Sequence, residues 1–414
     1  MTAHLIRQAI PGGLVEGSCD PRFAALADEF VRNFAERGEV GASLALTHEG
    51  RTVVDLWGGT ADAATGRAWH RDTVSIVFSC TKGATALCAH VLANRGALDL
   101  DARVTGVWPE FGQHGKDQVT TRMMLDHSAA VPVLRQKTPP GSLFDWNYMT
   151  ARVASEEAFW EPGTRNGYHP LTFGHTVGEM VRRCSGKSLG QFFRDEIAGP
   201  LGLDFWIGLP EAIEPRVAPI ILYRASAAEQ DTPFLNAALN VPGSIPNLFM
   251  FNSDWRQSVN TRAGHAAELG AANGITNGRG LAGLYAPLAN GGALDGVALV
   301  DADTLVRMGE VSMATHLDAT LMIPTRFSLG FMNSMDNRRN LGGQDSVILG
   351  RQAFGHVGAG GSIGFADPEC ALSLGYTMNK MGAGLMLNER GQSLVDAAYR
   401  CLGYRANESG CWLR

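Results

Sequence analysis

The placement of strand-like segments near both ends of the chain, with a long helical stretch between them, most constrains how this sequence can fold. The runs GASLALTHE (41–49) and TVVDLWGG (52–59) are typical of an antiparallel hairpin. Towards the other end, AFGHVGAGGSIGFADPE (353–369) and ALSLGYTMN (371–379) have the same β-rich character. The pattern therefore predicts one antiparallel sheet that uses both ends of the chain.

Helices are predicted on this sheet and between its halves. Apolar residues recur at helical spacing over 21–38, after an Asp-Pro pair that is typical of a helix start, and again over 394–403. A chain of 414 residues also exceeds one ordinary domain. We expect an α/β (α+β) fold with a discontinuous domain of residues 1–105 and 271–414, a mostly helical domain of residues 106–270, and an active site in the cleft between them.

The charge balance argues against nucleic acid and membrane partners. The chain carries 35 basic and 41 acidic side chains, for a net charge of -6, so it has no basic field that would gather phosphates or anionic lipid. No run of eighteen apolar residues predicts a membrane span. Pro11, Gly12 and Gly13 interrupt the first twenty residues, where an export signal needs an apolar run, so a cytoplasmic location is expected.

The seven cysteines are scattered and form no CxxC pair. This distribution is typical of free thiols in a reducing compartment and predicts neither disulfides nor a structural zinc site. We expect no metal and no cofactor. The sequence does not indicate an oligomeric state.

A Ser-x-x-Lys tetrad, Ser79 to Lys82, is the strongest chemical signal. It follows the strand-like run VSIVF (74–78) and opens a segment with helical periodicity that ends at Gly96. Three residues on a helix are close to one turn, so the amine can reach the hydroxyl. A serine hydroxyl becomes a good nucleophile only when a neighbour accepts its proton. A lysine in an otherwise apolar helix is costly unless it is needed, so Ser79 is the predicted nucleophile and Lys82 its base.

Two other nucleophiles are open to consideration. Cys80 stands beside Ser79, but no base is evident at a suitable spacing, and cysteine is commonly a small core residue. Ser362 lies in GGSIG, which matches the G-x-S-x-G elbow of α/β-hydrolases. That elbow needs a strand, a turn and a helix, whereas GFADPECALSLGY reads as strand, turn and strand, so both residues rank below Ser79.

Several collinear segments resemble the serine β-lactamase-like superfamily, which includes class C β-lactamases and penicillin-binding proteins, and more closely its family VIII carboxylesterases. The similarity covers nearly the whole chain and implies a β-lactamase/transpeptidase-like fold. The matching segments are SCTKGA at 79, MMLDHSAAVP at 123, FWEPGTRNGYHPLTFGHTVGEMVRR at 159, PLGLDFWIGLP at 200, NGRGLAGLYAPLANGG at 277 and FGHVGAGGSIGFADPE at 354.

The resemblance implies a second member of the proton relay. The family has a Tyr-x-Asn element after a W-x-P-G-T segment, and here WEPGT is followed by Tyr168, His169 and Pro170. Tyr168 is therefore expected to act with Lys82 as general base and acid. Pro170 stands where β-lactamases have an asparagine, which puts their lactam-binding geometry in doubt. We also expect Trp160 and His169 to face the substrate.

The third family element, Lys-Thr-Gly, appears here as His356, Val357 and Gly358. A mostly neutral imidazole in place of the lysine should weaken affinity for anionic substrates, which favours neutral esters. By the same resemblance His356 and Gly358 bind substrate, and His356 can donate a hydrogen bond to Tyr168. The backbone N–H groups of Ser79 and Ala359 would form the oxyanion hole.

These features predict a serine hydrolase that cleaves small carboxylic esters through an acyl-enzyme on Ser79. An amide-directed activity in the same fold, as a weak β-lactamase, D-aminopeptidase or amidase, is one alternative. An acyltransferase is another, because an alcohol can take the place of water. A non-catalytic scaffold is the third, although the joint presence of Ser79, Lys82 and Tyr168 argues against it.

Overall fold

The computed structural model describes residues 4–224, 232–339 and 345–414. In this part of the chain an 11-stranded antiparallel sheet forms the base of the molecule, in the order β1-β2-β4-β3-β16-β15-β14-β13-β12-β11, with β5 paired to β4. The expectation of a mixed fold built on a large antiparallel sheet is confirmed. The strands are β1 (His4–Ile10), β2 (Gly13–Cys19), β3 (Gly41–His48), β4 (Arg51–Asp62), β5 (Arg67–Ala68), β11 (Met313–Thr315), β12 (Thr325–Phe327), β13 (Met332–Asn333), β14 (Phe354–Val357), β15 (Ile363–Asp367) and β16 (Leu372–Met378).

Strand β16 joins the two ends of the chain. It pairs with β3 on one side, where Leu374 lies opposite Leu46, and with β15 on the other, where Leu374 lies opposite Phe365. All residues of β16 are buried, because helices cover both faces of the sheet at this point.

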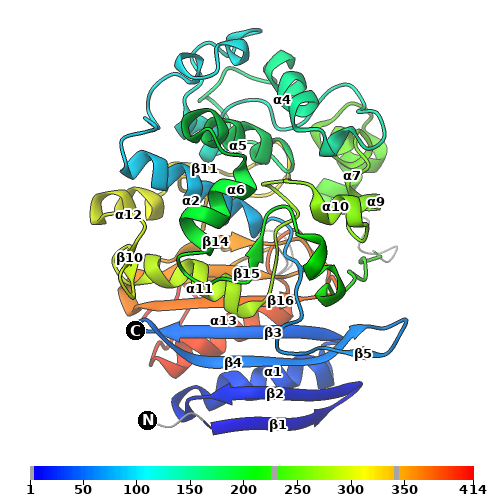
Figure 1. Cartoon of the computed structure of the whole chain (residues 1–414), viewed down its shortest axis with the longest axis vertical. Coiled ribbons are helices and arrows are strands. Elements are labelled where there is room, and N and C mark those ends of the chain that lie inside the picture. The colour runs from blue at the N-terminus through cyan, green and yellow to red at the C-terminus, as the bar shows by residue number, and fades with distance from the viewer. Residues whose placement is uncertain (1–3, 225–231, 340–344) are drawn as a thin grey trace.

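One helix covers one face of the sheet and a pair of helices covers the other (Figure 1). Helix α11 (Gly278–Ala289) packs against β3, β15 and β16, and α1 (Ala24–Glu36) packs against α13 (Glu389–Cys401). Phe30 of α1 and Leu394 of α13 belong to one apolar core with the strands, whereas the residues of α11 belong to a second core. The sheet therefore separates two hydrophobic cores.

The remaining helices lie mainly above the sheet in Figure 1. They are α2 (Thr81–Asn94), α3 (Thr121–Leu125), α4 (Trp146–Ser155), α5 (Thr172–Ser185), α6 (Leu189–Phe193), α7 (Pro233–Asn240), α8 (Ile245–Phe251), α9 (Trp255–Ser258), α10 (Arg262–Ala266) and α12 (Ala302–Gly309). None of the helices in the described ranges combines the length and apolarity that crossing a bilayer requires.

The strand expected over 74–78 is shorter than predicted and does not join the large sheet. Only β6 (Ser75–Ile76) is a strand, and it pairs with β8 (Ile275–Thr276), which also pairs with β7 (Phe205–Trp206). Two residues after the strand ends, the backbone turns at Phe78, whose φ is 46°. A further small pair joins β9 (Ala293–Leu294) to β10 (Val297–Ala298).

The first hairpin, β1 and β2, was not predicted from the sequence. Strands β1 and β2 flank the dipeptide Pro11-Gly12, which makes the connection, and Gly12 has a φ of 80° that favours glycine. A Pro-Gly pair between two short runs is a turn signal, so this hairpin was detectable in the sequence.

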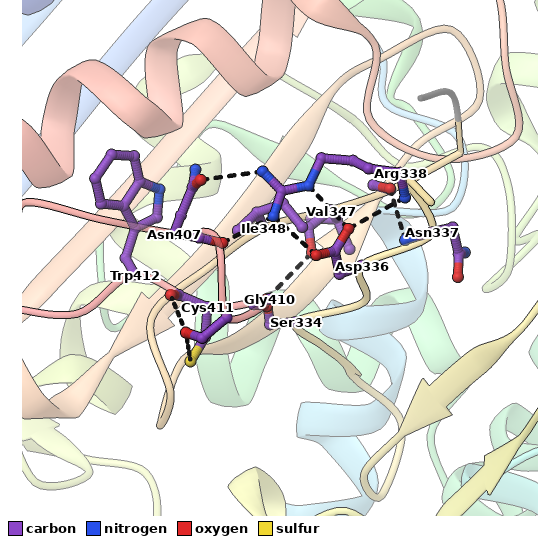
Figure 2. Close-up of polar contacts among 12 residues, drawn as sticks. Ser334, Asp336, Asn337, Arg338, Val347, Ile348, Asn407, Gly410, Cys411 and Trp412 are labelled. Atoms are coloured by element: carbon purple, nitrogen blue, oxygen red, sulfur yellow. Dashed lines mark hydrogen bonds and ion pairs between the residues drawn. The ribbon is translucent and has the colours of Figure 1, made fainter. Parts of the chain in front are cut away.

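The C-terminal segment is held against the large sheet by a polar network (Figure 2). Ser334 Oγ donates to the carbonyl of Gly410 at 2.7 Å and accepts from the N–H of Leu349 at 2.9 Å. The guanidinium of Arg338 donates to the Asp336 carboxylate and, at 2.8 Å, to the carbonyl of Asn407. The end of the chain is therefore an integral part of the fold.

Helix α11 approaches the sheet so closely that a side chain at one sheet position would collide with it. A Cβ atom on Gly375, in β16, would lie 2.3 Å from the carbonyl oxygen of Gly278 and 2.4 Å from the backbone nitrogen of Ala282. Both atoms belong to the helix backbone and cannot rotate away. Glycine at position 375 therefore sets the distance between α11 and the sheet.

We predict that Gly375→Ala lowers the free energy of unfolding by about 1–3 kcal/mol, because α11 must shift. Urea denaturation checks this. Gly106→Ala is the matched control, since an added methyl there meets nothing within 4 Å, and its effect should stay within about 0.5 kcal/mol. Equal effects of the two substitutions would contradict the packing argument.

Candidate active site

Ser79 lies two residues before α2, a helix whose residues are mostly buried. Its side chain is half-buried and lines a pocket with a cavity volume of about 100 Å³, whereas Phe78 and Cys80 on either side are buried. Phe78 has positive φ, which is rare for a bulky residue, and its carbonyl accepts a hydrogen bond from Thr81 Oγ1. Such strained positions persist where the surroundings fix them, often at functional sites. The turn leaves Ser79 at the pocket wall.

The amine of Lys82 is buried beside Ser79. Its Nζ lies 3.2 Å from Ser79 Oγ and 2.9 Å from each of the carbonyl oxygens of Pro170 and Ala271. No carboxylate of the described residues forms an ion pair with it, and burial lowers the pKa of Lys82 well below its usual value. A neutral amine has two N–H groups and one lone pair. The two carbonyls can take the N–H groups, which leaves the lone pair for the Ser79 proton.

Tyr168 lies near both Ser79 and Lys82, in the segment between α4 and α5. Its ring centroid is 4.6 Å from Lys82 Nζ, and the ring stacks on Phe327 at 5.8 Å. Burial raises the pKa of Tyr168 above its usual value, and a hydrogen bond with Ser79 opposes this shift only in part. The phenol therefore keeps its proton at neutral pH. In this form it can donate the proton to an oxygen atom in the site and then take another proton from the Lys82 amine.

A buried carboxylate that the sequence analysis missed holds Tyr168 in place. Both oxygens of Asp318 accept the N–H of Tyr168 at 3.0 Å, and Oδ1 also accepts the N–H groups of Thr320 and Leu321 at 2.8 Å. The bonds to Thr320 and Leu321 form a local turn of a kind typical of aspartate. The bond to Tyr168 spans 150 residues, so no local pattern predicts it.

The two residues whose backbone N–H groups are expected to form the oxyanion hole line the same pocket. Ser79 and Ala359 both belong to its wall, and neither N–H donates to another group in the described part of the chain. A Cβ on Gly358 would lie 2.2 Å from the carbonyl of Val77 and 2.3 Å from Ser362 Oγ. Glycine at 358 thus lets the end of β14 approach the segment before Ser79. Gly358 itself is buried and is not part of the pocket wall.

His356 lies behind the pocket wall. It is buried, its Nδ1 donates to the carbonyl of Val357 at 2.7 Å, and its Nε2 has no partner among the described residues. The ring centroids of His356 and Tyr168 are 6.1 Å apart, and no hydrogen bond joins the two side chains. Burial, reinforced by Lys82, lowers the pKa of His356 to about 3, so the ring is neutral. Its expected contact with substrate stays a prediction.

His169 and Trp160 also lie outside the pocket wall. His169 is buried, its Nδ1 donates to the carbonyl of Gly167 at 2.7 Å, and its Nε2 accepts the N–H of Val131 at 3.2 Å. With both ring nitrogens occupied, it shapes the loop that carries Tyr168. The Trp160 ring packs under the guanidinium of Arg165, 5.8 Å from its centroid.

Neither alternative nucleophile has the surroundings of a reactive group. Cys80 is buried, its thiol donates to the carbonyl of His356, and burial raises the pKa of Cys80 to about 12. Ser362 is also buried and donates to the carbonyl of Val77 at 3.2 Å. Strand β15 follows it directly, so the predicted strand, turn and strand are confirmed and no nucleophile elbow is formed.

The walls of the pocket are apolar, and the sequence analysis did not identify them. Most come from segments far from Ser79 in the sequence, and no lysine, arginine, aspartate or glutamate of the described residues is among them. Besides Ser79, Tyr168 and Ala359, the wall is formed by Phe78, Pro170, Leu171, Phe234, Phe249, Trp255, Ala272, Leu321, Met332, Val357, Gly384 and Leu385.

Comparison with known proteins identifies the family. The beta-lactamase family model matches residues 25–398. Esterase/beta-lactamase LipL of Mycobacterium tuberculosis (strain ATCC 25618 / H37Rv) is 34% identical over 389 residues, which cover 91% of this chain and 86% of that protein. The crystal structure of a family VIII carboxylesterase has 39% sequence identity and a TM-score of 0.80, and covers 94% of this chain and 99% of its own.

A penicillin-binding protein homologue from Caulobacter crescentus has 36% identity, a TM-score of 0.80 and the same coverage. The matches extend over most of the chain and well beyond the Ser-x-x-Lys tetrad. They show that this chain belongs to the beta-lactamase family and is a serine hydrolase.

Proposed function

We propose that this enzyme hydrolyses carboxylic esters through an acyl-enzyme on Ser79. The observation that carries the proposal is the Lys82 amine, buried without a counter-ion 3.2 Å from the Ser79 hydroxyl. A base of this kind is neutral nearer to physiological pH than an ordinary lysine, and it can take the serine proton as the new bond forms.

We expect the reaction to proceed in the following steps. Ser79 Oγ attacks the ester carbonyl as its proton passes to Lys82 Nζ, and the N–H groups of Ser79 and Ala359 bind the resulting oxyanion. The C–O bond to the alcohol then breaks. Tyr168 gives its proton to the departing alkoxide and takes one from Lys82. Water attacks the acyl-enzyme in the same way, and the acid is released with the serine restored.

The character of the pocket supports esters as substrates. Its wall holds no charged side chain of the described residues, and the nearby His356 is neutral. An uncharged apolar site binds a neutral ester without leaving a buried charge unpaired, whereas a substrate carboxylate would find no cation in the wall. The relatives reported above include proteins named as an esterase and a carboxylesterase.

Cleavage of β-lactams is the second candidate, because the relative LipL is named both an esterase and a beta-lactamase. Hydrolysis of p-nitrophenyl esters, measured beside that of a cephalosporin and of small peptides, separates the candidates. We expect kcat/KM to be highest for the esters. Turnover of amides alone would reject the ester proposal.

The nucleophile can be located by mass. After reaction with an alkyl fluorophosphonate, the intact protein should gain one phosphonyl group, and Ser79→Ala should gain none. Ser362→Ala is the matched control and should be labelled as the native enzyme is. Ester hydrolysis by Ser79→Ala should fall by about 10³-fold or more. If the label is lost in Ser362→Ala and kept in Ser79→Ala, Ser362 is the nucleophile.

The pH dependence should report the Lys82 amine. Because burial lowers the pKa of Lys82, the neutral and active form predominates above that lowered pKa and is lost as the pH falls through it. We expect kcat/KM to rise with pH along one limb whose midpoint lies well below about 10.4, the ordinary lysine value. Tyr168→Phe should keep the limb and lower the rate by about 10²–10⁴-fold. A Lys82→Met variant with nearly native activity would contradict this assignment.

Asp318 should act as a positioning residue. In Asp318→Asn one oxygen becomes an NH₂ group, which cannot accept the buried N–H groups that the carboxylate binds, and each lost bond costs about 1–3 kcal/mol. We expect lower stability and a fall in kcat of up to about 100-fold as Tyr168 shifts, with a smaller change in KM. Asp62→Asn is the control: Asp62 is the last residue of β4 and makes only exposed hydrogen bonds to the turn that follows, so this change should affect neither property. A native kcat in Asp318→Asn would reject the role.

A further inference from the structure

A row of aromatic rings leads away from the nucleophile. Phe78, next to Ser79, meets Trp255 edge-on with centroids 6.5 Å apart, and Trp255 stacks on Phe249 at 5.6 Å with an interplanar angle of 16°. All three residues line the active-site pocket. Phe249 belongs to α8, so this helix supplies the outer part of the row.

Beyond Phe249 lies a second hollow of about 30 Å³. Phe249 and Leu171 line both hollows, so these side chains separate them. Pro132, Val133, Leu134, Leu143, Met149 and Leu248 line the far side. Two apolar hollows thus meet at the Phe249 ring.

The second hollow offers an apolar chain few competing polar groups. Thr138 Oγ1 donates to the carbonyl of Asn252, Thr172 Oγ1 donates to the carbonyl of Val131, and Asn252 Nδ2 donates to the carbonyl of Leu134. These lining groups are already satisfied. Within the described residues, the Ser253 hydroxyl is the lining side-chain group that is both fully buried and without a partner.

Hydrogen bonds at both ends of helix α8 fix the position of Phe249. At its start, Ser244 Oγ donates to the carbonyl of Ala237 and Asn247 Nδ2 to that of Ala238, both in α7. At its end, the Asn252 side chain donates to the carbonyls of Leu134 and Arg135. The backbone carbonyl of Asn252 accepts from the N–H and the hydroxyl of Thr138. The helix is fixed to two separate parts of the protein, so Phe249 stands in a defined position.

We propose that Phe249 is a partition that limits the length of the apolar chain an ester can carry into this site. The proposal rests on the ester hydrolysis proposed above and adds a substrate class to it. With the ring in place, the hollow beside Ser79 accepts short chains. Without it, the two hollows become one and a longer unbranched chain can be buried.

The test compares kcat/KM over p-nitrophenyl esters from acetyl to octanoyl, and over n-alkyl butyrates of the same range. The first series varies the acyl chain and the second the alcohol, so together they show which part of the ester meets the partition. In Phe249→Ala we expect the ratio of kcat/KM for the octanoyl ester to kcat/KM for the butyryl ester to rise roughly tenfold or more. If the alcohol side meets the partition, the ratio for octyl butyrate against butyl butyrate should rise instead. Each buried methylene contributes to this discrimination.

Two variants on the same helix control the result. Phe251→Ala removes the same group from an exposed position that lines neither hollow, and should keep the native profile. Phe249→Ala combined with Leu248→Phe refills the second hollow and should cancel the gain for long chains. Leu248 is half-buried and lines only that hollow, so the native fold should tolerate the change.

The outcomes separate this inference from the proposed function. An unchanged chain-length profile in an active Phe249→Ala enzyme would overturn the partition and leave ester hydrolysis intact. A uniform loss for all chain lengths would also overturn it, because the ring would then support the whole site. A native enzyme that neither cleaves esters nor reacts with a fluorophosphonate at Ser79 would reject the function itself.

Discussion

The chemistry of this protein depends on one amine that is buried without a counter-ion. Burying an unpaired ammonium is so unfavourable that the group gives up its proton instead. The carbonyls of Pro170 and Ala271, which lie 88 and 189 residues away in the sequence, hold the Lys82 nitrogen beside Ser79. Folding therefore prepares the base, because only the folded chain brings these carbonyls to the helix.

The surroundings of the amine preserve this state by adding almost no charge. His127, His169 and His356 are all buried, and burial lowers the pKa of each, so three imidazoles near the site are neutral. The carboxylate of Asp318 contacts the backbone of Tyr168. Its oxygens accept hydrogen bonds from backbone N–H groups and not from the lysine. A carboxylate paired directly with Lys82 would instead favour the ammonium and remove the base.

The parts of the fold and site that local patterns could predict are those fixed by short-range geometry. The alternation in 41–59 and the β-rich 353–379 indicated a sheet from both chain ends, and one helical turn relates Ser79 to Lys82. The partners of Lys82, the bond from Tyr168 to Asp318, and the pocket wall at Phe249 depend on contacts over about a hundred residues or more. Periodicity carries no information at that range. The VSIVF run looked like a sheet strand because its composition does not reveal the backbone turn at Phe78.

The pairing of β3 with β16 has a consequence for how the chain is made. Strand β3 ends at His48 and its neighbour begins at Leu372, so a ribosome must add more than three hundred residues before the sheet can close. At about 5–20 residues per second this takes tens of seconds. During that time β1 to β5 present an unpaired apolar edge, which is the kind of surface that neighbouring nascent chains recognise. The pairing that unites the two ends of the enzyme is therefore also the step that removes this exposed edge, and it can take place only late in synthesis.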